Sequence, residues 1–257
     1  ADLLIAVTEK DELNMVACFM SRGAGAKSTI ARVRNPGYSD FDDSARLETL
    51  GIDMLINPER VTAAEIVKLI DFPEANYVGY FGEGEVQMLE LRLDEHCAYL
   101  DIPLKDIPNP APCIVVGIER AGKLLIPRGD TCLKADDDLL LLANTKDMRR
   151  LERFLNIRVI NPHNVVIMGG SLSGFYLAQM LERRRLKLNV KLLERDRERC
   201  EEMAARLKST AIILSDVTNM QMYEDENLGE ADVFVAISDD DKENLFASLL
   251  AKSMGAK

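Results

Sequence analysis

The chain has 257 residues, of which 47% are hydrophobic and 29% charged, so it can bury a core and is not disordered. Asp and Glu number 43 against 32 Lys and Arg, which gives a net charge of −11. A surface of that sign repels nucleic acid, so we expect no nucleic-acid partner. Five scattered cysteines and two histidines argue against a disulfide framework, a zinc site and a catalytic histidine.

Residues 1–72 alternate between predicted strands and predicted helices. The apolar run Leu3–Val7 is typical of a buried parallel strand. Two more short strands and three helical segments follow it, ending at Pro73. The strands are expected over 28–33 and 54–56, and the helices over 11–20, 41–50 and 58–71. This rhythm predicts a doubly wound α/β sheet of the Rossmann type.

Residues 73–155 have a different texture and predict a small α+β module. Segments 77–81 and 86–93 flank a glycine-rich turn, and 113–118 and 123–127 flank Arg120-Ala121-Gly122, so each pair predicts a hairpin. A further strand over 139–143 and a helix over 145–155 complete the module. No catalytic constellation is visible in it.

Residues 156–162 are predicted to be a linker, and residues 163–257 return to the α/β rhythm. Strands are expected over 164–168, 189–193, 210–214 and 231–237, and helices over 171–183, 196–207 and 241–254. The predicted fold is therefore two Rossmann-type parallel sheets, both incomplete, flanking the α+β module.

An internal repeat relates the two α/β segments. Residues 1–27 and 231–257 align without a gap, and nine of the 27 positions are identical, among them Asp11/Asp241 and Asn14/Asn244. Chance at average composition would give roughly two identities. The offset of 230 residues predicts a duplicated unit of that length. Both ends of the chain look abrupt, so we expect this sequence to be part of a longer protein.

The sharpest motif for ligand binding follows the strand at 164–168. The segment Gly169-Gly170-Ser171-Leu172-Ser173-Gly174 opens a helix, and Glu194 closes the next strand. Glycines allow a tight turn there, the helix N-terminus attracts a pyrophosphate, and the acidic residue accepts hydrogen bonds from ribose hydroxyls. The motif departs from the dinucleotide fingerprint because Ser171 replaces the second glycine.

Other polar residues follow neighbouring predicted strands. Asp216 and the pair Ser238-Asp239 follow strands of the second α/β segment, and Thr8-Glu9 holds the equivalent place in the first. Ligands bind at the carboxyl ends of parallel strands, and Arg32 in the next strand could meet phosphate. The acidic run 239–241 fits a helix cap better than a cation site, so we expect no metal.

Several segments together resemble the TrkA family of RCK (KTN) proteins. They are "ADLLIAVTEKDELNMVAC", "IARVRNPGY", "GIDMLINPE", "GKLLIPRGDTCLKADDDLLLLA", "VVIMGGSLSG", "VKLLERD" and "ADVFVAISDDDKENL". The resemblance covers nearly the whole chain. It implies that 1–72 is the later part of a first RCK-N domain, 73–155 an RCK-C domain, and 163–257 the start of a second RCK-N domain.

The resemblance also implies a function. Members of this family are cytosolic regulators that assemble as rings on a potassium-translocating membrane subunit, and NAD(H) or ATP/ADP bound to RCK-N domains controls gating. A homo-oligomer, peripheral on the inner face of the membrane, is expected. The matching positions for the nucleotide are Gly169, Gly170, Ser171, Ser173, Gly174, Glu194, Asp216, Ser238 and Asp239, with Thr8, Glu9 and Arg32 from the first copy.

Two alternatives stay open from the sequence. An NAD-dependent oxidoreductase has a similar fold but needs a proton donor beside the nicotinamide, and no His, Cys or Tyr-x-x-x-Lys is convincingly placed for that role. A scaffold with an empty crevice would share every fold feature. We therefore expect a regulator rather than an enzyme, with nucleotide binding as the property that separates it from a scaffold.

Overall fold

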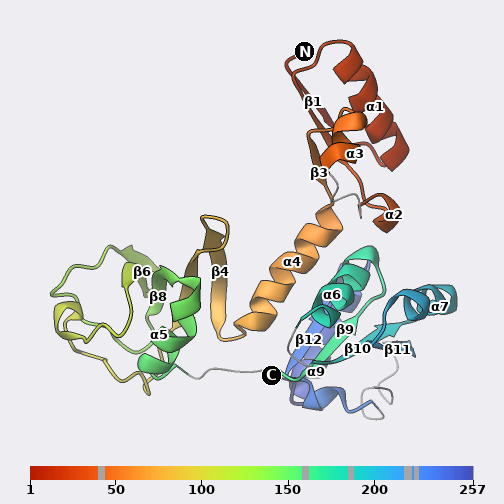
Figure 1. Cartoon of the computed structure of the whole chain (residues 1–257). Coiled ribbons are helices and arrows are strands. Elements are labelled where there is room, and N and C mark those ends of the chain that lie inside the picture. Colours follow the sequence, from red (N-terminus) through yellow and green to blue (C-terminus); the bar gives the residue numbers. More distant parts are fainter. Residues whose placement is uncertain (40–43, 158–161, 185–187, 217–221, 223–225, 257) are drawn as a thin grey trace. The chain divides into compact units, whose positions relative to one another are not determined.

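The structure is a computed structural model that describes residues 1–39, 44–157, 162–184, 188–216, 222 and 226–256 (Figure 1). The chain divides into two compact units, one made of residues 1–65 and 164–257 and the other of residues 66–163. Helix α4 (Pro58–Asp71) crosses from the first unit to the second. Of the predicted linker, residues 158–161 lie outside the described residues.

The N-terminal part of the first unit is a parallel sheet of three strands in the order β1-β2-β3. Each strand is followed by a helix, as predicted, and the helix expected over 41–50 is described from Ser44. The strands are β1 (Leu3–Ala6), β2 (Ser28–Arg32) and β3 (Met54–Ile56), and the helices before α4 are α1 (Asp11–Gly23), α2 (Pro36–Ser39) and α3 (Ser44–Thr49).

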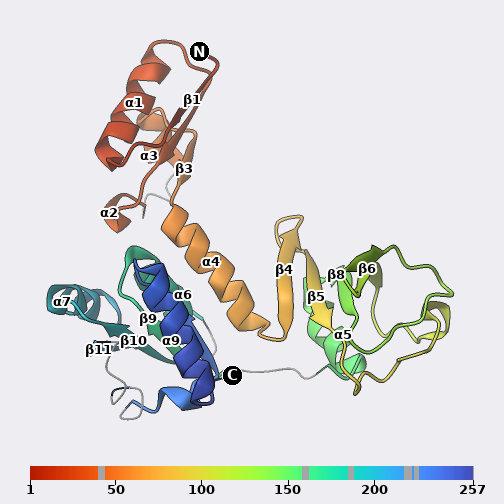
Figure 2. The same ribbon diagram turned by 180° about the vertical axis from the view of Figure 1, so that it is seen from behind.

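The C-terminal part of the first unit is a second parallel sheet, in the order β11-β10-β9-β12. Its helices α6 and α9 lie on opposite faces of the sheet (Figures 1 and 2). This doubly wound arrangement confirms the predicted Rossmann-type fold. The strands are β9 (Asn164–Met168), β10 (Asn189–Glu194), β11 (Ala211–Leu214) and β12 (Val233–Ala236), and the helices are α6 (Leu172–Glu182), α7 (Arg197–Arg206) and α9 (Asp241–Ser253).

The order of these strands places the site. The chain runs from β9 outward to β10 and β11 on one side, then returns to pair β12 with the other side of β9. Direction therefore reverses between β9 and β12, which is where open α/β sheets bind ligands. Apolar side chains from both strands, including Val166 and Met168, pack against Ala247 of α9.

The two copies of the sequence repeat make equivalent hydrogen bonds. In the first copy the Asn14 side chain accepts from Thr8 N (2.8 Å) and donates to Thr8 O (2.9 Å). In the second copy Asn244 makes the same pair with Ser238, at 2.8 and 3.0 Å. Each asparagine thus fixes the turn from a strand to the following helix, which explains why this residue is shared by both copies.

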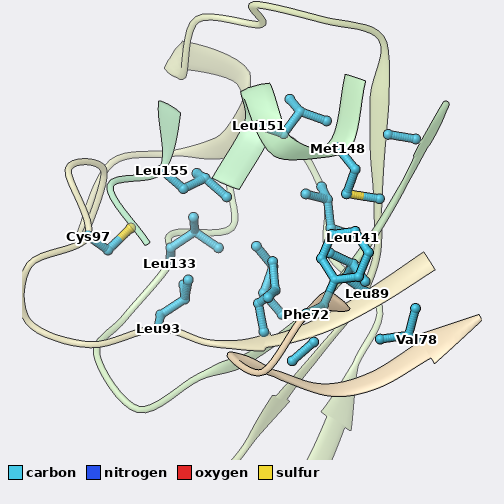
Figure 3. Packing of buried hydrophobic residues seen from close by; sticks show 14 of the residues in the cluster. Phe72, Val78, Leu89, Leu93, Cys97, Leu133, Leu141, Met148, Leu151 and Leu155 are labelled. Carbon is cyan, nitrogen blue, oxygen red and sulfur yellow. The ribbon is translucent and has the colours of Figure 1, made fainter. Parts of the chain in front are cut away.

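The second unit is an antiparallel sheet in the order β4-β5-β8-β6-β7, covered by helix α5. Figure 3 shows Met148 and Leu151 of α5 above Leu89 and Leu141 of the sheet. The predicted α+β module is confirmed, with Ala121 and Gly122 at positive φ in the β6–β7 turn. The elements are β4 (Ala75–Phe81), β5 (Val86–Arg92), β6 (Cys113–Arg120), β7 (Lys123–Leu125), β8 (Asp138–Asn144) and α5 (Met148–Phe154).

A buried ionic cluster joins α5 to the end of α4 inside the second unit. The Arg149 guanidinium donates to Glu74 (2.5 Å), to Glu152 (3.1 Å) and to the Asp71 carbonyl, and it lies over the Phe72 ring. The side chains of Glu74 and Glu152 are 7% and 0% exposed. Two carboxylates therefore share one cation where water does not reach them.

The cluster lacks a hydrogen-bond donor when both carboxylates are ionised. Glu74 Oε2 and Glu152 Oε1 have no partner among the described residues. Burial raises the pKa of Glu152 to about 8; Arg149 opposes this increase and Glu74 adds to it. A proton on Glu152 supplies the missing donor to Glu74, so the protonated form is the satisfied one.

This cluster predicts that the second unit loses stability as the pH rises. The folded state keeps a proton on Glu152 up to about pH 8, whereas the unfolded chain releases it near the ordinary glutamate pKa. The free energy of unfolding should therefore fall between about pH 5 and pH 8, by at most ~1.4 kcal/mol per pH unit, and level off above. Hydrogen exchange of the β5 and β8 amides measures this unit alone.

The matched variants are Glu152→Gln, which is permanently neutral, and Glu95→Gln, an exposed glutamate of the same unit. Glu152→Gln should flatten the pH dependence and protect these amides better than the parent chain at pH 9. Glu95→Gln should leave the pH dependence as it is. An unchanged slope in Glu152→Gln would contradict the assignment.

Candidate functional site

The glycine loop between β9 and α6 is built from close main-chain contacts. Gly169 has φ of +110°, and a Cβ there would lie 2.6 Å from Ser238 N. A Cβ on Gly174 would lie 2.0 Å from the Gly169 carbonyl oxygen. Both positions need glycine, the first for its backbone angle and both for space. These contacts draw the first turn of α6 and the end of β12 against the loop.

Gly170, and not Ser171, occupies the crowded position of the loop. Ser171 is the N-cap of α6 at φ −63°, an angle that any residue adopts, and its Oγ donates to the Ile237 carbonyl (2.9 Å). Gly170 is the position without room, because a Cβ would lie 2.5 Å from Met203 Cε and 2.7 Å from Glu194 Oε2. The loop itself therefore accommodates the side chain of Ser171.

Glu194 is buried at the end of β10 and organises the loop. Its Oε2 accepts from Gly170 N at 2.6 Å and its Oε1 accepts from Asp196 N at 2.8 Å. Each carboxylate oxygen has a second lone pair, so the side chain can still accept hydrogen bonds from a ligand hydroxyl. It thus positions the loop in addition to the ribose role that the motif predicts.

A cavity of about 330 Å³ lies at the carboxyl ends of these strands, a size that small ligands occupy. Five of the predicted residues line it: Gly169, Ser171, Glu194, Ser238 and Asp239. Gly170, Ser173 and Gly174 belong to the adjoining loop and first turn of α6. Asp216 is not among the lining residues, whereas its neighbour Ser215 is.

Five charged lining residues are absent from the predicted set, and three of them form ion pairs across the cavity. Arg195 and Arg199 follow β10, and Glu243 lies in the first turn of α9. Arg195 pairs with Glu243 at 2.9 Å and Arg199 with Asp239 at 3.5 Å, so two ion pairs join opposite walls of the cavity. The partners are at least 40 residues apart in sequence, and no short motif signals such a pairing.

The residues predicted from the first copy belong to the sheet β1-β2-β3 and the turn after β1, and they do not line this cavity. The Thr8 hydroxyl donates to Asn14 Oδ1 (2.7 Å), and Glu9 is exposed beside it. Arg32 ends β2, and its buried Nε has no hydrogen-bond partner among the described residues. That these three residues contact a ligand stays a prediction.

Two kinds of feature are missing from the described part of the chain. No group of three or more His, Cys, Asp and Glu side chains there has an arrangement that could hold a metal ion. No described helix is long and apolar enough to cross a bilayer. A separate cavity of about 350 Å³ in the second unit has a floor of buried leucines and contains none of the predicted residues.

Comparison with known families identifies the two kinds of domain. The TrkA-N domain matches residues 1–58 and 165–257, and the TrkA-C domain matches residues 88–156. The chain belongs to the TrkA family. This confirms the resemblance seen in the sequence, including a TrkA-N match on both sides of the TrkA-C match.

Curated relatives match the chain over its whole length. It is 33% identical to Trk system potassium uptake protein trkA homolog 1 of Methanosarcina mazei, covering 64% of that protein. It is 36% identical to Trk system potassium uptake protein TrkA of Halomonas elongata, covering 56% of it. The chain therefore spans roughly three-fifths of the length of these TrkA relatives.

Solved structures share the fold. The GsuK channel matches with a TM-score of 0.66 at 18% identity, over 99% of this chain and 44% of that one. The GsuK channel bound to NAD matches with a TM-score of 0.62 at 17% identity, over 100% of this chain and 48% of that one. At these identities the likeness supports the RCK fold alone.

The packing of the glycine loop predicts that Gly174→Ala is strongly destabilising. The new Cβ would overlap a main-chain oxygen 2.0 Å away, which no side-chain rotation relieves, so a loss of about 3 kcal/mol is expected. Gly23→Ala, at the end of α1, is the control because its Cβ would meet nothing within 4 Å. Urea unfolding followed by circular dichroism measures both, and equal effects of the two changes would contradict the packing.

Proposed function

We propose that the cavity between β9, β10 and β12 binds an adenine nucleotide, NAD(H) or ATP/ADP, and that this TrkA-family chain is part of a cytosolic regulator of potassium uptake. The observation that carries the proposal is the meeting of three features at one cavity. The glycine loop, the N-terminus of α6 and the Glu194 carboxylate all face it or adjoin it.

Each feature matches a part of a nucleotide. The first turn of α6 has main-chain N–H groups without an intrahelical acceptor, and with the helix dipole they favour a phosphate. Ser171 caps Gly174 N and leaves the N–H groups of residues 171–173 for the ligand. Glu194 has lone pairs for ribose hydroxyls. Ser238 and Asp239 close the far wall, with Thr8, Glu9 and Arg32 proposed for the equivalent site of the first copy.

The regulatory role is proposed from the relatives. They are named as potassium uptake proteins, and a structure sharing the fold is a channel bound to NAD. We propose that the whole protein acts on a potassium-translocating membrane subunit, from the cytosolic face, through a conformational change that the nucleotide biases.

Assembly into a homo-oligomer is part of the proposal. Val16 and Phe19 of α1 are exposed, and so are their repeat equivalents Phe246 and Leu249 of α9. The same apolar helix face is therefore presented by both copies. Exposed apolar patches of this kind mark protein contacts, and a self-assembling ring would bury them.

The variant Ser171→Asp tests nucleotide binding at the α6 N-terminus. Asp caps a helix as well as Ser, but it cannot donate to the Ile237 carbonyl as Ser171 does, so circular dichroism must first show that the fold is kept. Its charge lies beside the place where the phosphate would sit. Calorimetric titration with NAD⁺, NADH, ADP and ATP should show affinity at least about tenfold weaker than in Ser171→Asn, the neutral control of the same shape. Binding that Ser171→Asp leaves unchanged would place the ligand elsewhere.

The same preparations separate the rival functions. Absence of binding by the parent chain would favour a scaffold. Turnover of a reduced cofactor would favour an oxidoreductase. In cells, loss of the whole protein should lower potassium uptake at millimolar supply, and unchanged uptake would contradict the regulatory role.

A further inference from the structure

The wall of the nucleotide cavity is strongly acidic. Five carboxylates line it against two guanidinium groups: Glu194, Asp196, Asp239, Asp240 and Glu243 against Arg195 and Arg199. A nucleotide is itself an anion. The acidic side chains therefore oppose the attraction of the α6 N-terminus for phosphate, and their repulsion grows with each phosphate charge that enters.

Three of the five carboxylates hold the fold. Glu194 accepts from Gly170 N and Asp196 N. Asp196 caps α7 by accepting from Glu198 N and Arg199 N, and Asp240 caps α9 in the same way. Main-chain N–H groups thus stabilise the negative charges of these three residues.

The other two carboxylates form ion pairs across the cavity. Glu243 pairs with Arg195 at 2.9 Å, and Asp239 pairs with Arg199 at 3.5 Å. The arginine side chains are 66% and 49% exposed, and exposed pairs contribute little to stability. An entering phosphate can take the arginines for itself, but the released carboxylates stay in the wall and repel it.

The repeat shows that the charge at position 243 is not required by the fold. The first copy has Leu13 at the position of Glu243 and Lys10 at the position of Asp240, and it keeps an acid, Glu9, at the position of Asp239. Helix α1 nevertheless forms over Asp11–Gly23, and Lys10 makes no side-chain cap. The charge of Glu243 is thus specific to the second copy and is available for ligand selection, while an acid at the position of Asp239 is common to both copies.

We propose that Asp239 and Glu243 make this site selective for nucleotides of low negative charge, so that it prefers NAD⁺ to NADH and either dinucleotide to ADP or ATP. The proposal rests on the nucleotide binding proposed above. Arg195 and Arg199 are the cations that contact the ligand, and the two carboxylates set how strongly each further charge is penalised.

The test measures the affinities of the full chain for NAD⁺ and ATP, without Mg²⁺, by calorimetric titration. The variant Asp239→Asn with Glu243→Gln should raise ATP affinity roughly five- to tenfold and NAD⁺ affinity less than about twofold. The gain for ATP should shrink when salt is raised, because these side chains are partly exposed.

The control is Glu201→Gln with Glu202→Gln, on α7. It changes the net charge by the same amount, but neither residue lines the cavity, so the ratio of the two affinities should stay as in the parent chain. A ratio that moves equally in both double variants would reduce the effect to net charge and overturn the proposal.

Other results also overturn it, and they are distinguishable from failure of the proposed function. A parent chain that binds ATP more tightly than NAD⁺ contradicts the selectivity but not the nucleotide site. Tighter binding of ATP with Mg²⁺ that Asp239→Asn abolishes would assign the carboxylates to a metal. If neither nucleotide binds, the proposed function and the selectivity fail together.

Discussion

The close approach of the β9–α6 loop to the end of β12 is the contact on which the site depends. A Cβ on Gly169 would collide with Ser238 N at 2.6 Å, and Ser171 Oγ donates to the neighbouring Ile237 carbonyl at 2.9 Å. Because the loop and the strand end touch through main-chain atoms, the segment after β12 lies beside the glycine loop. The contact that packs the sheet therefore also forms the cavity.

Glu194 extends this constraint to β10. By accepting from Gly170 N and Asp196 N, one buried carboxylate fixes both the glycine loop and the turn into α7. A buried carboxylate is costly unless it is hydrogen-bonded, so its geometry is tightly specified. Ligand recognition by Glu194 would consequently be inseparable from the shape of the loop.

Local patterns predicted the parts of this structure that local physics decides. Apolar runs located the parallel strands, glycines located the loop, and the internal repeat placed Thr8-Glu9 and Ser238-Asp239 at equivalent strand ends. The Arg195–Glu243 pair and the Glu74–Arg149–Glu152 cluster were not predicted, because their members are brought together only by the folded chain. Charged residues occur throughout the sequence, and nothing local marks which of them meet.

Comparison of the two copies shows which positions the fold requires and which positions can vary. Asn14 and Asn244 make equivalent hydrogen bonds, so the position that holds the strand-to-helix turn is the same in both. Positions 10 and 13 carry Lys and Leu where 240 and 243 carry Asp and Glu, although a helix of the same length follows in each copy. The Glu243 side chain pairs with the exposed Arg195, and an exposed ion pair adds little to stability, so this position can change between copies without disturbing the sheet. If both copies bind nucleotides as proposed, a duplicated chain of this fold would set two different electrostatic conditions for them on one unchanged framework.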